Sequence, residues 1–222
     1  MDASADAPRS DRLPMRVFAL SASRRVESLN SRLLALAVEA LVADDVEVEV
    51  ANIRDFDLPN FDGDLQEAEG VPEAAQRLAR HIEESDGFVI ASPEYNASMP
   101  GVLKNALDWV SRLRPQPFAS THCMLLSASP SMSGGNRGLW ALRIPLEHLG
   151  TRVHPDMFSL AQARTAFSDD GQLTNPELAE RLRKVMFDWA DLIEAAKHYP
   201  CAKARWVEFL GERPEPAVDR VQ

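Results

Sequence analysis

Three loops of this sequence combine hydroxyl, guanidinium and amide side chains in patterns that suit a small anionic or heterocyclic ligand. The loop at residues 21–30 contains three serines, two arginines and an asparagine. The loop at residues 92–101 contains two prolines, an asparagine and a glycine, and the loop at residues 127–136 contains four serines and two adjacent glycines. We therefore examine these loops as candidate binding segments.

The loop at residues 21–30 has the chemistry of a phosphate site. It precedes a helical pattern, and the free N–H groups of a helix N-terminus favour an anion, to which Ser and Arg side chains add donors. It matches neither the Walker A nor the Gly-x-Gly-x-x-Gly pattern. A serine N-cap flanked by solvated arginines explains the same residues equally well, so composition alone leaves both interpretations open.

The other two loops suit the edges of a flat ring. Prolines hold the backbone of residues 92–101 in fixed directions, so its N–H and C=O groups can be aimed at a heterocycle. The glycines of residues 127–136 allow a ligand to approach closely. The alternatives are a helix-entry loop, with Lys104 and Asp108 as a surface ion pair, and a flexible connector.

Apolar patterning predicts the elements that position these loops. Strands are expected at residues 15–21, 46–50, 87–91, 121–127 and 153–160, and helices begin near residues 29, 72, 100, 136 and 175. Such alternation predicts an α/β fold, a doubly wound five-stranded parallel sheet with helices on both faces. Residues 46–50 alternate strictly, which favours an edge strand and the flavodoxin-like order 2-1-3-4-5. Ligands of such sheets bind beyond the carboxyl ends of the strands, where the three loops meet.

Composition excludes several classes of protein. The 222 residues include 24 Lys and Arg against 34 Asp and Glu, a net charge of −10, which argues against nucleic acid or an anionic membrane as partner. No apolar run is long enough for a membrane span, and the start lacks the apolar stretch of a secretory signal. Two cysteines cannot form a disulfide framework, so we expect a cytoplasmic location. The expected organisation is a flexible segment 1–14, one domain 15–196 and an extension 197–222.

Three motifs resemble the NADPH-dependent FMN reductase family, which includes quinone, chromate and azo reductases. The family pattern Gly-Ser-x-Arg-x-x-Ser-x-Asn corresponds to residues 22–30, with Ala22 in place of the usual glycine. The long pattern from Pro-Glu-Tyr-Asn to Asp-Trp is matched throughout by Pro93 to Trp109. The third pattern is a Gly-Gly loop leading to a helix with a Leu-Arg pair and an ending like Leu-Gly-x-x-Val-x-Pro. It is matched by Gly134-Gly135, Leu142-Arg143 and Leu149-Gly150 with Val153 and Pro155. The resemblance covers about residues 15–196.

The resemblance implies an FMN-dependent oxidoreductase that passes two electrons from NADPH or NADH to a quinone, chromate, an azo compound or free flavin. FMN carries the chemistry, so no residue is expected to act as a catalytic acid or base, and no metal is expected. The phosphate would be held by Ser23, Arg25, Ser28 and Asn30. The isoalloxazine ring would be lined by Pro93, Glu94, Tyr95 and Asn96 on one side and by Ser129, Ser131 and Gly134 on the other.

Relatives build the active site across a two-fold interface, so the resemblance also implies a homodimer or homotetramer, with Trp109 and Trp140 as candidate interface anchors. Two other functions stay open. One is an electron-carrying flavodoxin, against which the arginines and the Pro-Glu-Tyr-Asn segment argue. The other is a flavin-binding regulatory protein without turnover.

Overall fold

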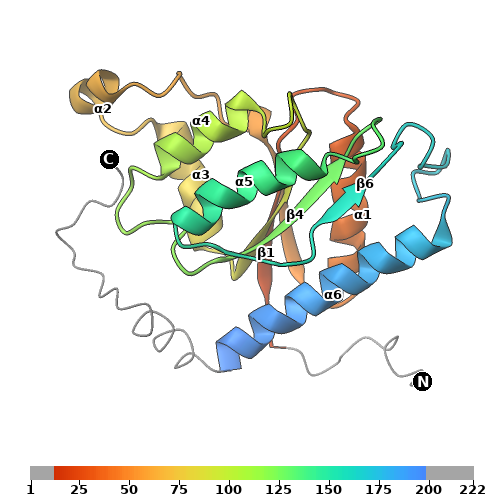
Figure 1. The fold of residues 1–222 in the computed structure, drawn as a ribbon. Helices are drawn as coiled ribbons and strands as arrows, with labels where there is room; N and C mark the ends of the chain where they lie inside the picture. Colours follow the sequence, from red (N-terminus) through yellow and green to blue (C-terminus); the bar gives the residue numbers. More distant parts are fainter. Residues whose placement is uncertain (1–12, 199–222) are drawn as a thin grey trace.

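In the computed structural model, which describes residues 13–198, six strands and six α-helices follow one another along the chain (Figure 1). The strands are β1 Arg16–Ser21, β2 Glu47–Asn52, β3 Gly87–Ala91, β4 His122–Ala128, β5 Arg152–Val153 and β6 Phe158–Leu160. The helices are α1 Leu29–Val42, α2 Gly63–Glu69, α3 Glu73–Glu83, α4 Gly101–Val110, α5 Asn136–His148 and α6 Pro176–His198, and a short 3-10 turn, η1 Ile53–Asp55, follows β2.

All strand pairs in the sheet are parallel, and the order is β2-β1-β3-β4-β5. This confirms the flavodoxin-like order predicted from the sequence, with the alternating strand β2 at an edge. Reversal of the strand order between β1 and β3 creates the crevice in which open α/β sheets bind ligands. The loops that follow β1 and β3 flank that crevice.

Two apolar cores lie on opposite faces of the sheet. In β1, Val17 and Ala19 pack into one core, with residues of α1 and α6, while Phe18 and Leu20 pack into the other, with residues of α3, α4 and α5. Both sets in β1 are buried, as expected for a parallel strand covered by helices on each side. The helices thus hold the strand ends, and the loops beyond them, in fixed positions.

The segment 153–160, predicted to contain the fifth strand, holds two short strands instead of one. Both pair with β4: Val153 lies opposite Cys123, and Phe158 lies opposite Leu126. Pro155 lies between them, and a proline has no N–H for the ladder. Strand β5 pairs with the amino end of β4, and β6 pairs with its carboxyl end. The break therefore places β6 beside the candidate site.

The sequence patterns also missed helix α2. None of its residues is buried, so it has no apolar stripe that could have predicted it. Figure 1 shows α2 at one end of the molecule, beyond α3 and α4.

Helix α6 runs two residues past the domain boundary expected at residue 196. Lys197 lies in its last turn, where Nζ donates to the carbonyl of Pro14 at 2.6 Å and contacts Asp86 Oδ2 at 2.8 Å. The N–H of Leu13 donates to Glu194 Oε1 at 3.1 Å. Residues 1–12 of the expected flexible segment and residues 199–222 of the expected extension lie outside the described residues. Across residues 13–198, no helix has the length and apolarity that a membrane crossing demands.

Gly87 tests the packing of α6 on the sheet. A Cβ atom at this position would lie 2.7 Å from Ile193 Cδ1 and 2.9 Å from Trp189 Cζ2. We expect Gly87→Val to lower the free energy of unfolding by about 1–3 kcal/mol through overpacking, measured by denaturant titration. Gly63→Ala is the matched control, because nothing lies within 4 Å of the added methyl group. An unchanged midpoint for Gly87→Val would contradict this packing.

Candidate functional site

Backbone hydrogen bonds continue the sheet beyond its carboxyl edge and bring the three loops together. The N–H of Ala22 donates to the carbonyl of Ala91 at 2.9 Å, and the N–H of Ser92 donates to the carbonyl of Leu126 at 2.9 Å. Beyond β4, the N–H of Ser129 donates to the carbonyl of Leu160 at 3.1 Å. The first residues of each loop are thus held like strand residues, and the candidate segments leave the sheet side by side.

The loop after β1 presents donors at the N-terminus of α1. Ser28 caps this helix, and its Oγ accepts from the N–H of Ser31 at 3.3 Å. Ser23 is buried, and its Oγ accepts from the N–H of Arg25 at 3.4 Å. Arg24 and Arg25 are exposed and form no ion pair with residues 13–198. Two guanidinium groups and a helix N-terminus together favour an anion at this place.

The structure gives Asn30 a role that its sequence motif does not reveal. Its side chain is buried, with Nδ2 donating to the carbonyl of Ala128 at 3.0 Å and Oδ1 accepting from the N–H of Ala128 at 2.9 Å. This pair of bonds ties the start of α1 to the end of β4. Asn30 therefore positions two of the three loops, and its expected contact with a phosphate stays a prediction.

The loop after β3 is a tight hairpin. Tyr95 and Ser98 exchange two backbone hydrogen bonds, of 2.9 and 3.0 Å. The two residues between them, Asn96 and Ala97, have φ angles of 52° and 61°, the left-handed pair that a two-residue hairpin turn requires. For alanine this conformation costs roughly 1–2 kcal/mol. Strain of this kind is concentrated at binding sites, where a fixed backbone aims polar groups at a ligand.

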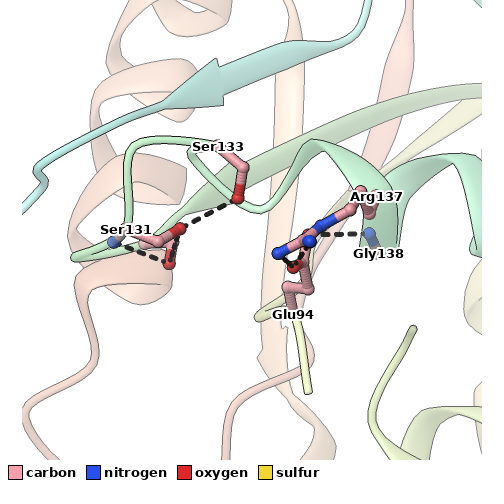
Figure 2. Close-up of polar contacts among 6 residues, drawn as sticks. Glu94, Ser131, Ser133, Arg137 and Gly138 are labelled. Carbon is pink, nitrogen blue, oxygen red and sulfur yellow. Dashed lines mark hydrogen bonds and ion pairs between the residues drawn. The ribbon is translucent and has the colours of Figure 1, made fainter. Parts of the chain in front are cut away.

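The Glu94 carboxylate joins this hairpin to the start of α5 (Figure 2). Its Oε1 accepts from Arg137 Nε at 3.1 Å and from Nη2 at 2.8 Å, while Oε2 accepts from the N–H of Gly138 at 3.0 Å. The side chain is only 7% exposed. Burial acts to raise the pKa of Glu94, but the Gly138 N–H and the Arg137 guanidinium outweigh it and hold that pKa below its usual value. Glu94 is therefore a charged cap on α5.

Close approach of these segments requires glycine at two positions of the loop and helix that follow β4. A Cβ atom on Gly138 would lie 3.1 Å from the Cα of Glu94. Gly135 has a φ of +86°, and its Cβ would lie 1.9 Å from Ser127 Oγ. A side chain at position 138 would press against the hairpin, and one at position 135 would clash with Ser127 of β4. The sequence identified the Gly-Gly pair as an opening for a ligand. The structure shows that both glycines serve internal packing, since a Cβ atom on Gly134 would lie 2.9 Å from the backbone nitrogen of Ala161.

A row of hydroxyl groups crosses the loop after β4. Ser129 Oγ lies 3.0 Å from Ser131 Oγ, which lies 2.9 Å from Ser133 Oγ (Figure 2). Ser131 is exposed, and Ser129 and Ser133 are half-buried. Below them, Ser127 Oγ is buried and has no hydrogen-bond partner within residues 13–198. The predicted residues Ser129 and Ser131 are thus brought together, and Ser133 extends the row through an i, i+2 spacing that could have been recognised in the sequence.

Two residues of the long motif support a neighbouring loop. Asn105 Oδ1 accepts from the N–H of Phe61 at 2.7 Å, and its Nδ2 donates to the carbonyl of Pro59 at 2.9 Å. Trp109 Nε1 donates to the same carbonyl at 2.8 Å. The expectation that Trp109 anchors an interface is wrong, because its side chain is fully buried within this chain and packs against Phe61. The expected Lys104–Asp108 ion pair is present at 2.7 Å.

The donor set fits FMN. The anion site at α1 suits its phosphate, and the hairpin and serine row suit the polar edges of its ring. Cys123 is not an alternative nucleophile, since burial raises the pKa of its thiol well above the usual value. We missed Arg137 and Gly138 in the sequence, because residues that follow Glu94 by more than forty positions show their contact only in the fold.

Comparison with known proteins agrees with this chemistry. The family model for NADPH-dependent FMN reductases matches residues 15–165. An NAD(P)H-dependent FMN reductase of Pseudomonas aeruginosa is 36% identical over 173 residues, covering 77% of this chain and 90% of that protein. A quinone reductase of Escherichia coli is 44% identical over 97 residues, covering 44% of this chain and 52% of that protein.

Among solved structures, the flavoenzyme NAD(P)H:(acceptor) oxidoreductase FerB of Paracoccus denitrificans superposes with a TM-score of 0.69 and 29% identity. The match covers 82% of this chain and 98% of that one. The similarity extends over nearly the whole of both folds, so it confirms the resemblance drawn from the three motifs.

Glu94→Gln tests the link between the hairpin and α5. We expect the variant to be less stable at neutral pH by about 1.5–3 kcal/mol, the usual contribution of hydrogen bonds to a charged group. Because the pKa of Glu94 is lowered from 4.5 in the folded chain, this stabilisation is complete above that pH and is lost as pH falls through the lowered pKa. Denaturant titrations should therefore show wild type and variant converging on acidification.

Arg137→Ala is the matched variant for this test. It leaves the bond between Glu94 and the Gly138 N–H in place, and the Arg137 side chain is 64% exposed, so its loss should cost less than Glu94→Gln. A stability difference between wild type and Glu94→Gln that does not change with pH would contradict a charged cap.

Proposed function

Because this chain belongs to the NADPH-dependent FMN reductase family, we propose that its three-loop site binds FMN and reduces a quinone-type acceptor with NADPH or NADH. The observation that carries this proposal is the Glu94 contact, which joins the strained hairpin after β3 to the start of α5, the helix that follows the serine row. The reaction transfers two electrons and two protons to the quinone and leaves an oxidised nicotinamide and a hydroquinone. The chemistry that bound FMN supplies is this two-electron transfer.

The phosphate of FMN is assigned to the loop after β1. Ser23 and Ser28 offer hydroxyl groups beside the N–H groups of α1, and Arg25 offers a guanidinium that has no acidic partner within residues 13–198. In a chain of net charge −10, local positive charge of this kind is what allows an anion to bind.

The ring of FMN is assigned to the space between the other two loops. Pro93 to Asn96 would contact one side, mainly through the backbone groups of the hairpin, and Ser129, Ser131 and Gly134 would contact the other. Tyr95 is half exposed beside this opening, which suits a wall against which a donor or acceptor ring can pack. These residues bind and orient, and none of them has to exchange a proton to support the proposal.

Steady-state turnover tests the proposed function. With added FMN, the full-length protein should oxidise NADPH when 1,4-benzoquinone is present and produce hydroquinone in equal amount. Free FMN without protein is the control. Stoichiometric FMN binding without turnover would instead identify an electron carrier or a regulatory flavoprotein, and would overturn the proposal.

Arg25→Ala tests the phosphate assignment. Loss of a charge-assisted bond should weaken FMN by about 1.5–3 kcal/mol, or roughly 10- to 100-fold in the dissociation constant, measured by flavin fluorescence titration. Arg183→Ala, an exposed arginine of α6 that pairs with Glu180, is the control and should bind as wild type does. An unchanged dissociation constant for Arg25→Ala would remove that residue from the site.

We also propose that the protein is a cytoplasmic homodimer or homotetramer. Support for association comes from Trp140 and Ile144, which are 54% and 72% exposed and lie one helical turn apart on α5, so they share a face. Large apolar side chains gathered on one exposed face commonly mark interfaces. The acidic composition and the pair of cysteines support the location.

Ile144→Lys tests the association. A lysine in an apolar interface would be buried without a partner, so the variant should shift the mass measured by light scattering from a multiple of 24.6 kDa toward the single chain. Its melting temperature gives the control for folding. A wild-type mass of one chain at micromolar concentration would contradict the proposal.

A further inference from the structure

A groove between α1 and the edge strand β2 adjoins the loop after β1 and lies away from the other two loops assigned to FMN. Its volume is about 620 Å³, which lies within the usual range for small-molecule sites. One wall is a face of α1, and the other is formed by the end of β2 and the turn η1. Its lining includes Val26, Leu34, Val38, Glu39, Val50 and Arg54.

The middle of the groove is apolar and open to water. Val26 and Val50 line it and are 83% and 58% exposed. Leu34 and Val38 of α1 contribute the facing wall from successive turns. Covering exposed aliphatic side chains with a flat ring is favourable because it removes apolar surface from water. The groove therefore has the shape and surface for an aromatic heterocycle.

Arg54 lies at the polar end of this groove. Its Nε donates to Asn52 Oδ1 at 3.3 Å, and its guanidinium forms no ion pair within residues 13–198. Two carboxylates also line the groove, each with one oxygen hydrogen-bonded: Asp55 Oδ2 accepts from the N–H of Asn52 at 2.8 Å, and Glu39 Oε2 accepts from Gln172 Nε2 at 3.3 Å. Among the described residues, the Arg54 guanidinium is the one cationic group of the lining.

The groove is continuous with the loop assigned to the FMN phosphate. Val26 belongs to that loop and lines the groove. Ser31 also lines the groove: its N–H donates to the helix cap Ser28, and its Oγ lies 2.7 Å from Ser21 Oγ. Strands β2, β1 and β3 are neighbours, so the groove lies about two strand spacings, or roughly 10 Å, from the end of β3. A dinucleotide can span this distance.

The position of Arg54 also bears on the choice of nucleotide. In the doubly wound folds that bind dinucleotides, an acidic side chain about 20 residues after the phosphate loop binds the ribose 2′-hydroxyl of NADH, and an arginine nearby accommodates the 2′-phosphate of NADPH. Both residue types follow β2 here, as Arg54 and Asp55. Asp55 Oδ2 is held in the capping box of η1, whereas the Arg54 guanidinium has no ion-pair partner within residues 13–198.

We propose that the groove between α1 and β2 binds the adenosine end of NADPH, with Arg54 paired to the 2′-phosphate and Val26 and Val50 against the adenine. This inference rests on the proposed function, since it places the distant half of the electron donor for the same flavin site. It makes Arg54 a specificity-determining residue, with no part in flavin binding.

Calorimetric titration of the FMN-loaded, full-length protein tests this inference without turnover. Adenosine 2′,5′-bisphosphate should bind about 10-fold or more tightly than 5′-AMP, because only the former carries the 2′-phosphate. Arg54→Ala should abolish this difference, and Val50→Glu should weaken both nucleotides by placing a carboxylate beside the ring. Arg183→Ala, on α6, should leave both affinities unchanged.

Kinetics gives a second readout. Arg54→Ala should raise KM for NADPH about 10-fold or more while KM for NADH, kcat and the affinity for FMN stay at wild-type values. The inference would be overturned if wild type bound the two nucleotides equally, or if Arg54→Ala left the affinity difference and KM for NADPH unchanged. Competition between the bisphosphate and FMN would also overturn it. Absence of turnover in the wild type would instead overturn the proposed function. Normal turnover together with any of those results would overturn only the assignment of the groove to NADPH.

Discussion

One buried carboxylate sets the spacing of the candidate site. Glu94 accepts hydrogen bonds from the side chain of Arg137 and from the backbone of Gly138, so the hairpin after β3 cannot move independently of α5. A polar group at this depth is costly unless its bonds are satisfied, and here both oxygens have partners. The hairpin is therefore joined to α5, which follows the serine row, before any ligand arrives, and this preorganisation reduces the entropy that binding has to overcome.

The remaining contacts of the site extend this arrangement. Asn30 ties the start of α1 to the end of β4, and the glycine at position 138 allows the hairpin to approach α5 closely. The two residues thus act mainly through the positions of other groups. A flavoenzyme of this kind needs its protein to bind and orient, because the cofactor carries the electron transfer. The rigidity of the loops is accordingly the main functional property of the fold.

Much of this fold could be predicted from the sequence because its strands are short apolar runs separated by clear turn residues. The order of the strands and the edge position of β2 follow from that pattern. Pro155 broke the fifth strand, and α2 has no buried residue to reveal it. In the site, the motif predicted which loops meet, but the contact of Glu94 with Arg137 and the burial of Trp109 depend on packing between distant segments.

The central claim is that the loop after β1 binds a phosphate and the other two loops bind the flavin ring attached to it. Titrating the full-length protein with FMN and with riboflavin, which lacks the phosphate, tests this claim most directly. We expect one FMN per chain, with riboflavin bound about 100-fold or more weakly because a phosphate at Arg25 and the N-terminus of α1 adds several charge-assisted bonds. Equal affinity for the two flavins, or no binding of either, would contradict it.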